Sequence, residues 1–221
     1  LKTAEDLGAR GDPALKRERA ELYRRMGQTR EAMGVFVELR DANLLTDAET
    51  LELAHMQAAI GDVKGAWASI EQVQKRKPDD PDAKAVEAEI LLLKGEEVLG
   101  ARLLDRLISD TPGLAPARVA RARYFLANGL AEEAEQDLAE VSPDYALRPE
   151  VRALKARTLN TLKKYDAAIA ILEPLSDANP KDAEVAAQLA ETFLLAGRTE
   201  EAEALVDRAL MVRPKFARAI Y

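Results

Sequence analysis

Glycines recur at one constant interval in this chain. Of its 11 glycines, five share a spacing of 34 residues, with a lysine at the one missing place. These positions are Gly27, Gly61, Gly95, Gly129, Lys163 and Gly197. A period of this length is the signature of a stacked repeat architecture, in which each unit is one small supersecondary motif. The chain is therefore expected to fold as an array of similar units.

Other columns repeat in the same register. Two hold small residues: Ala20, Ala54, Ala88, Ala122, Ala156 and Ala190, and then Ala32, Ala66, Gly100, Ala134, Ala168 and Ala202. A third holds large apolar residues: Phe36, Ile70, Leu104, Leu138, Leu172 and Val206. Small side chains let two helices approach closely, and a large apolar side chain fills the space beside them. Each unit therefore reads as two amphipathic helices joined by a short turn.

The ends of these helices are also marked. Prolines, which stop a helix, close four units at Pro78, Pro112, Pro180 and Pro214, whereas Leu44 and Ala146 break this column. Thr46 and Glu49 form a capping-box pattern at a helix start. The predicted units are 13–46, 47–80, 81–114, 115–148, 149–182 and 183–216. Residues 1–12 read as the tail of a preceding helix, and 217–221 as the start of a further one.

The pattern resembles the tetratricopeptide repeat family. The units from Glu184 to Pro214 and from Leu51 to Pro78 match it best, and Tyr165-Asp166-Ala167-Ala168 looks like the start of its second helix. The resemblance implies an all-α solenoid, a right-handed superhelix of six antiparallel helix pairs whose first helices line a concave groove. It also implies a non-catalytic scaffold that binds a protein or peptide. Lys163, at a turn that favours glycine, predicts a strained or differently shaped corner.

Composition narrows the possible functions. The formal net charge is −7, which opposes non-specific binding of nucleic acid. There is no cysteine, and aromatic residues make up only 5%, few for a β-sandwich or barrel. No apolar run approaches a membrane span of about 20 residues. The chain begins at Leu1 without methionine and reads as a fragment, so the cytoplasm and the periplasm both stay open as compartments.

Catalytic and metal-binding patterns are weak. His55 is the single histidine, so histidine triads and multi-histidine metal sites lack members. The run from Asp177 to Lys181 starts like a calcium loop, but Asp182 stands where glycine is required and Gln188 where the closing glutamate should be. No nucleotide-binding loop is present. We therefore expect no enzyme, cofactor or metal centre.

The resemblance places a partner-binding groove on the first helices. Three groove-facing columns contribute the candidate residues Arg17, Arg24, His55, Glu89, Leu92, Arg123, Leu126, Arg157, Asn160 and Glu191. Arg123, Arg157 and Asn160 are predicted to form a subsite for a carboxylate or an acidic peptide, because arginine binds carboxylates with paired, charge-assisted hydrogen bonds. The alternative is a solvated face whose charges pair within the chain.

Three functional hypotheses follow. The first is a protein-binding scaffold, within a larger bacterial assembly. The second is self-association, in which the ends of the solenoid stack to form oligomers. The third is binding of nucleic acid through basic first helices, which the acidic total opposes.

Overall fold

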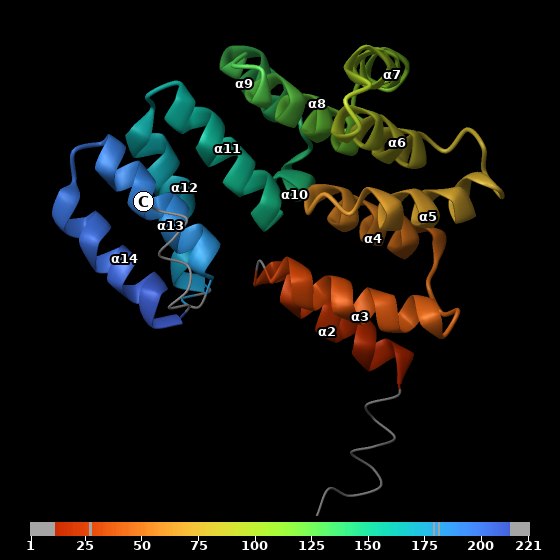
Figure 1. Ribbon diagram of the computed structural model, residues 1–221, viewed down its shortest axis with the longest axis horizontal. Helices are drawn as coiled ribbons and strands as arrows, with labels where there is room; N and C mark the ends of the chain where they lie inside the picture. The colour runs from red at the N-terminus through yellow and green to blue at the C-terminus, as the bar shows by residue number, and fades with distance from the viewer. Residues whose placement is uncertain (1–11, 27, 179, 181, 213–221) are drawn as a thin grey trace, which may run out of the picture. The chain divides into compact units, whose positions relative to one another are not determined.

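All regular structure in the part of the chain that the structure describes is α-helical. The computed structural model describes residues 12–26, 28–178, 180 and 182–212 (Figure 1). In the first half lie α2 (Pro13–Arg25), α3 (Thr29–Asp41), α4 (Asp47–Ala59), α5 (Val63–Gln74), α6 (Pro81–Leu93) and α7 (Glu97–Asp110). They are followed by α8 (Ala115–Ala127), α9 (Ala131–Ala139), α10 (Pro143–Ala146), α11 (Pro149–Thr161), α12 (Tyr165–Ala178), α13 (Ala183–Leu195) and α14 (Thr199–Val212). The all-α prediction is confirmed.

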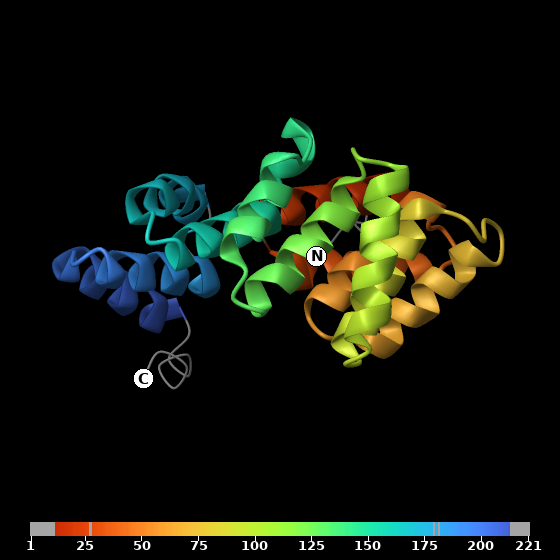
Figure 2. The ribbon, with the colours of Figure 1, turned by 90° about the horizontal axis from the view of Figure 1, so that it is seen from above.

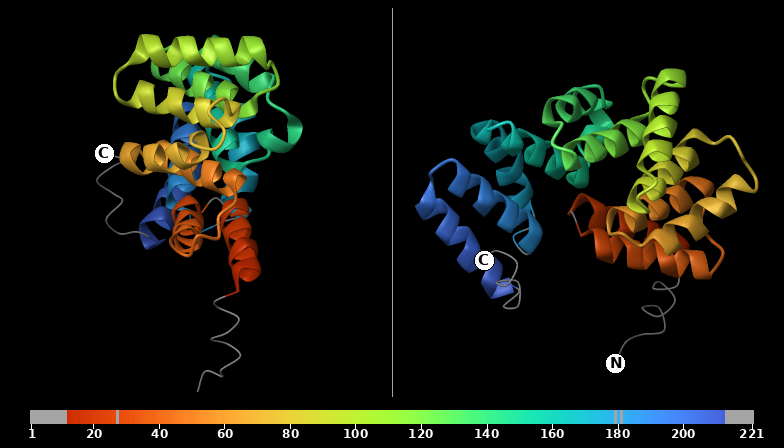
Figure 3. Two further views of the ribbon diagram at one scale, coloured as in Figure 1. Left: turned by 90° about the vertical axis from the view of Figure 1, so that its right-hand side faces the viewer. Right: turned by 45° about the horizontal axis from the view of Figure 1, so that its top comes forward.

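The helices come in pairs that follow the 34-residue period. One pair falls inside each predicted interval, and α10 is an extra turn between α9 and α11. Within a pair the two helices lie side by side, as α2 with α3 and α13 with α14 show (Figures 1, 2 and 3). The expected flanking segments at 1–12 and 217–221 lie outside the described residues, apart from Asp12, which caps α2. None of the described helices has the length and apolar character needed to cross a membrane.

The chain divides into two compact units at Tyr124 and Phe125, here called unit 1 and unit 2. The core of unit 1 includes a cluster of Leu51, Ile70, Val73, Val86 and Ile90, contributed by α4, α5 and α6. The core of unit 2 includes Leu159, Leu172, Leu189 and Phe193 from α11, α12 and α13. Each core is thus shared between consecutive helix pairs, as it must be when one pair alone cannot bury its apolar face.

The small-residue columns lie where helices touch. Ala66, Ala134 and Ala168 are fully buried. At Gly100, an added Cβ would lie 2.7 Å from Leu92 Cγ and 2.8 Å from the Ala88 carbonyl oxygen. Because these separations are shorter than a van der Waals contact, α6 and α7 could not keep this spacing with a larger residue.

The turns within the pairs share one backbone shape. Gly61, Gly95, Gly129 and Gly197 have φ between 76° and 80°, and Lys163 has φ 59°. The amide of Lys164 donates to the Leu159 carbonyl (2.8 Å) and that of Lys163 donates to the Asn160 carbonyl (3.0 Å), the paired bonds of a Schellman cap. Of the two alternatives predicted at Lys163, a strained or a differently shaped corner, the strained one therefore holds. Lysine adopts the left-handed conformation there, which is strained for a residue with a Cβ.

The fourth helix pair departs from the pattern. Its second helix, α9, ends at Ala139, and the chain then makes the short helix α10 before α11 begins. Val141 is buried, whereas Leu147 is exposed. This irregular stretch contains Ala146, which takes the place of the proline that closes other units. In those units Pro78, Pro112 and Pro180 each follow the end of a second helix, and Pro214 lies outside the described residues.

Candidate partner-binding surface

Two predicted groove residues of unit 1, His55 and Arg123, each contact a third, Glu89. Glu89 on α6 is buried, with a side chain only 7% exposed. One of its carboxylate oxygens pairs with Nη1 of Arg123 on α8, and the other lies 3.8 Å from Nδ1 of His55 on α4. We expected these side chains to line an exposed groove. Instead, Glu89 is enclosed by the helices on either side. Out of water its ionised form needs a neighbouring cation, and Arg123 supplies one.

The two predicted arginines of α2 are also engaged within the chain. Arg17 Nε donates to Glu49 Oε1 (2.5 Å), and Arg24 forms ion pairs with Glu21 and Glu52, both at 3.3 Å. The hydrogen bond to Glu49, followed by the charge of that carboxylate, raises the pKa of Arg17. Burial alone would raise the pKa of Glu49, but the hydrogen bonds from Arg17 and Thr46 outweigh burial and lower it. These contacts join the first and second helix pairs.

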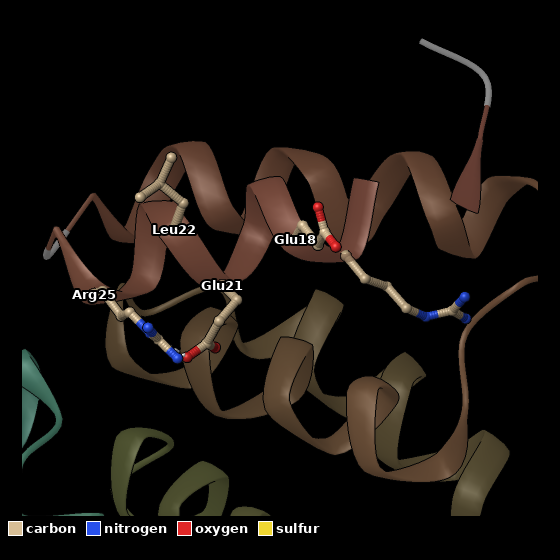
Figure 4. A pocket seen from close by; sticks show the side chains of 5 residues that line it. Glu18, Glu21, Leu22 and Arg25 are labelled. Atoms are coloured by element: carbon tan, nitrogen blue, oxygen red, sulfur yellow. Dashed lines mark hydrogen bonds and ion pairs between the residues drawn. The ribbon is translucent and has the colours of Figure 1, made fainter. Parts of the chain in front are cut away.

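The surface of α2 carries a shallow pocket (Figure 4). It is lined by Arg17, Glu18, Glu21, Leu22 and Arg25. The Glu21 and Arg25 side chains point toward one another, with Arg25 Nε 3.0 Å from Glu21 Oε1. Leu22 is exposed at the rim. Because Arg17, Glu21 and Arg25 already pair within the chain, these three side chains have little to offer a charged ligand.

The basic stripe of α8, made up of Arg118, Arg121 and Arg123, is likewise paired within the chain. Arg118 Nε donates to the Pro112 carbonyl (2.7 Å), and Arg121 Nη1 donates to Asp105 (2.8 Å). Together with the pairing of Arg123, these contacts account for all three arginines of the stripe. The predicted alternative, charges that pair within the chain, therefore holds for the arginines of α8.

In unit 2, polar side chains join the first helices of two consecutive pairs. Asn160 Nδ2 on α11 donates to Thr192 Oγ1 on α13 (2.7 Å). Gln188 Nε2 on α13 donates to the Ala153 carbonyl on α11 (2.9 Å). Thr192 Oγ1 in turn donates to the Gln188 carbonyl (2.7 Å). These bonds set the register between α11 and α13 and hold one continuous surface across both helices.

We call this surface the α11–α13 face. It comprises Ala153, Arg157, Asn160, Ala187, Glu191, Leu194 and Leu195. Arg157 and Glu191 are exposed, and the described part of the chain offers no ion-pair partner to the Arg157 guanidinium. Leu194 is 51% exposed and Leu195 is 49% exposed. Apolar area and an available cation thus lie together on two helices that hydrogen bonds hold in place.

Comparison with known proteins agrees with this architecture. Residues 160–220 match the family model described as tetratricopeptide repeat. This C-terminal part of the chain therefore carries the tetratricopeptide repeat pattern. Among solved structures, MamA of strain MSR-1 has a TM-score of 0.56 at 20% identity, covering 76% of this chain and 97% of that one. A search of curated proteins found no match.

Two further structures share the tetratricopeptide fold. A tetratricopeptide repeat protein from Parabacteroides merdae gives a TM-score of 0.52 at 18% identity, covering 92% of this chain and 85% of that one. YrrB, described as a tetratricopeptide protein with an unusual peptide-binding site, gives 0.55 at 12% identity, covering 84% and 95%. At these identities the likeness establishes the fold, which is the predicted α-solenoid of helix pairs.

The remaining predicted groove residues differ in how exposed they are. Leu92 packs against the core cluster of α6, α7 and α8, and Leu126 is half-buried. Leu195, which the groove columns did not include, is exposed beside Leu194. Its signal in the sequence is a leucine one position after the last groove column, a signal that Leu93 of the third repeat shares and that is absent at Arg25, Ala59, Ala127 and Thr161. Within the described ranges, no group of three or more His, Asp or Glu side chains could hold a metal ion.

Proposed function

We propose that this chain is a non-catalytic scaffold whose α11–α13 face binds a protein segment carrying an acidic and an apolar side chain. The observation that carries the proposal is the exposed Arg157 guanidinium, which has no ion-pair partner in the described part of the chain, on the same face as two exposed leucines. Family analogy supports it, since a peptide-binding site is described for YrrB, which has the same fold.

The chemistry of this face matches such a segment. A carboxylate on the partner can accept two parallel hydrogen bonds from Arg157, which are stronger than bonds between neutral groups. Apolar partner side chains would cover Leu194 and Leu195, and removing apolar area from water contributes about 25 cal/mol per Å². Glu191 would repel a second acidic group placed near it, so the position of the charge along the segment matters.

This assignment replaces the subsite of Arg123, Arg157 and Asn160 that the sequence predicts. Arg123 is paired with the buried Glu89, and taking it away would leave that carboxylate uncompensated. Asn160 uses its amide group to hold Thr192. Arg157 is the member of the three whose charge is available to a ligand.

The test is binding of a labelled peptide that alternates glutamate and leucine, measured by fluorescence anisotropy. Arg157→Glu should weaken binding by tenfold or more, because it replaces a charge-assisted contact, worth about 1.5–3 kcal/mol, with repulsion. Leu194→Asp should also weaken it. The matched control is Lys155→Glu, which makes the same charge change on the opposite side of α11. Equal affinities for the Arg157→Glu and Lys155→Glu variants would contradict the proposal.

Nucleic-acid binding receives no support from the described residues. The arginines of α8, one of the basic first helices on which this hypothesis rested, make contacts within the chain. We expect no retention on single-stranded DNA at low salt, where phosphate contacts are strongest. Retention that falls steeply as salt is added would revive this function.

A further inference from the structure

Three consecutive first helices of unit 1 place ionisable groups at one register position. His55, Glu89 and Arg123 are separated by 34 residues each, on α4, α6 and α8. Glu89 lies between the other two and is buried, while the side chains of His55 and Arg123 are 18% and 36% exposed. The buried carboxylate is therefore shared between one permanent cation and one group that titrates near neutral pH.

The two contacts of Glu89 differ in kind. Arg123 contacts one carboxylate oxygen directly and stays protonated at any physiological pH. His55 Nδ1 lies 3.8 Å from the other oxygen, which is longer than an N–H to oxygen hydrogen bond of about 2.7–3.2 Å. A neutral imidazole gains little at this separation. An imidazolium gains a charge–charge attraction in a site with little solvent to screen it.

Several other charges around α4 have partners elsewhere. On α6, Lys84 pairs with Asp79, and Glu87 accepts a hydrogen bond from Gln74 Nε2. Glu52, on α4 itself, pairs with Arg24 of α2, which also pairs with Glu21. On α3, Glu38 pairs with Lys16 and Arg19, and Arg40 pairs with Asp41. On α5, Glu71 pairs with Lys75. Arg123 opposes protonation of His55 and Glu89 favours it, and Glu89 is the group that both cations contact.

We infer that His55 and Glu89 form a proton-operated clasp between the second and third repeats, closed when His55 is charged. The carboxylate raises the pKa of His55 above its unfolded value of about 6.5. The clasp then contributes stability that is fully present below about pH 6.5 and is lost as the pH rises through the folded-state pKa. Acidification through neutral pH thus tightens the packing of α4 on α6.

The sole histidine makes the test direct. The full chain shows one imidazole Cε1–H proton resonance, whose chemical shift is followed from pH 5 to pH 9 by NMR. We expect a pKa above 6.5 in the wild type. Glu89→Gln should lower it by about one unit, a tenfold change in proton affinity. Arg123→Gln should raise it, because Glu89 then faces His55 alone.

The clasp predicts that Glu89→Gln and Arg123→Gln shift the pKa of His55 in opposite directions. A general loss of structure would instead bring the pKa of His55 in both variants toward its unfolded value. Glu191→Gln, at the equivalent register position on α13 of unit 2, is the control and should leave the pKa unchanged. Urea unfolding gives a second readout. The wild type should gain stability over His55→Gln as the pH falls from 8 to 6. A wild-type pKa at or below 6.5, or one that Glu89→Gln does not move, overturns the inference.

Discussion

Lys163 shows how a single residue can be strained by the shape of its repeat. The Schellman bonds that end α11 require a left-handed residue, and the other equivalent turns that the structure describes use glycine, at Gly61, Gly95, Gly129 and Gly197. In that conformation the Cβ of lysine is crowded by its own backbone, which destabilises the folded state. Lys163→Gly should therefore raise the free energy of unfolding by about 1 kcal/mol. Chemical denaturation of both proteins measures the difference.

The control for this change is Thr161→Gly, at the exposed last residue of α11. Glycine there should lower stability by about 0.5–1 kcal/mol, because it adds conformational freedom to the unfolded chain. It also removes the exposed hydrogen bond from Thr161 Oγ1 to the Arg157 carbonyl (3.1 Å). If Lys163→Gly lost stability as Thr161→Gly does, relief of strain would not be the dominant effect at this turn.

Glu49 couples a helix cap to a contact between repeats. It completes the capping box with Thr46 and also binds Arg17 of the preceding pair. Its pKa is lowered, so the stability that it adds is present above its ordinary value of 4.5 and is lost as the pH falls through the lower folded-state pKa. We expect the wild type to be more stable than Glu49→Gln at pH 7 and this advantage to shrink below pH 4.5. Thermal unfolding at several pH values tests this, and an advantage that grows on acidification would contradict it.

At the scale of the element, helix crossings depend on the small-residue columns. Ala168 on α12 is fully buried, whereas its neighbour Ala167 is exposed. Ala168→Leu should overpack the crossing and lower stability by about 1–3 kcal/mol. Ala167→Leu adds the same atoms toward solvent and should change stability by less than about 0.5 kcal/mol. Similar losses from both variants, measured by denaturant unfolding, would show that the packing at Ala168 is not tight.

At the scale of the whole molecule, the open question is association. The exposed leucines of the α11–α13 face could cover one another in a dimer instead of binding a different protein. We expect the chain to remain monomeric by light scattering from micromolar to several hundred micromolar, because Arg157 and Glu191 border these leucines and two leucines bury little area. A mass that doubles with concentration, and returns to that of a monomer in Leu194→Asp, would favour self-association.

The sequence by itself determined the paired helices and their turns, whereas the extra helix α10 was not predicted. The reason is that these depend on local requirements: a left-handed residue at a turn, a small residue at a crossing and a proline after a helix end. Even the unusual corner at Lys163 follows the common backbone, since its hydrogen bonds are the same as those of the glycine corners.

Only the tertiary structure decided which groove positions are available to a partner. Glu89 and Arg157 occupy the same register position, yet Glu89 is buried between His55 and Arg123 while Arg157 is exposed. Register sets the direction of a side chain from its own helix. Whether that side chain is exposed or paired depends on the charged residues of the neighbouring repeats. These residues lie one repeat away in the sequence, and their charge is not fixed by the repeat pattern.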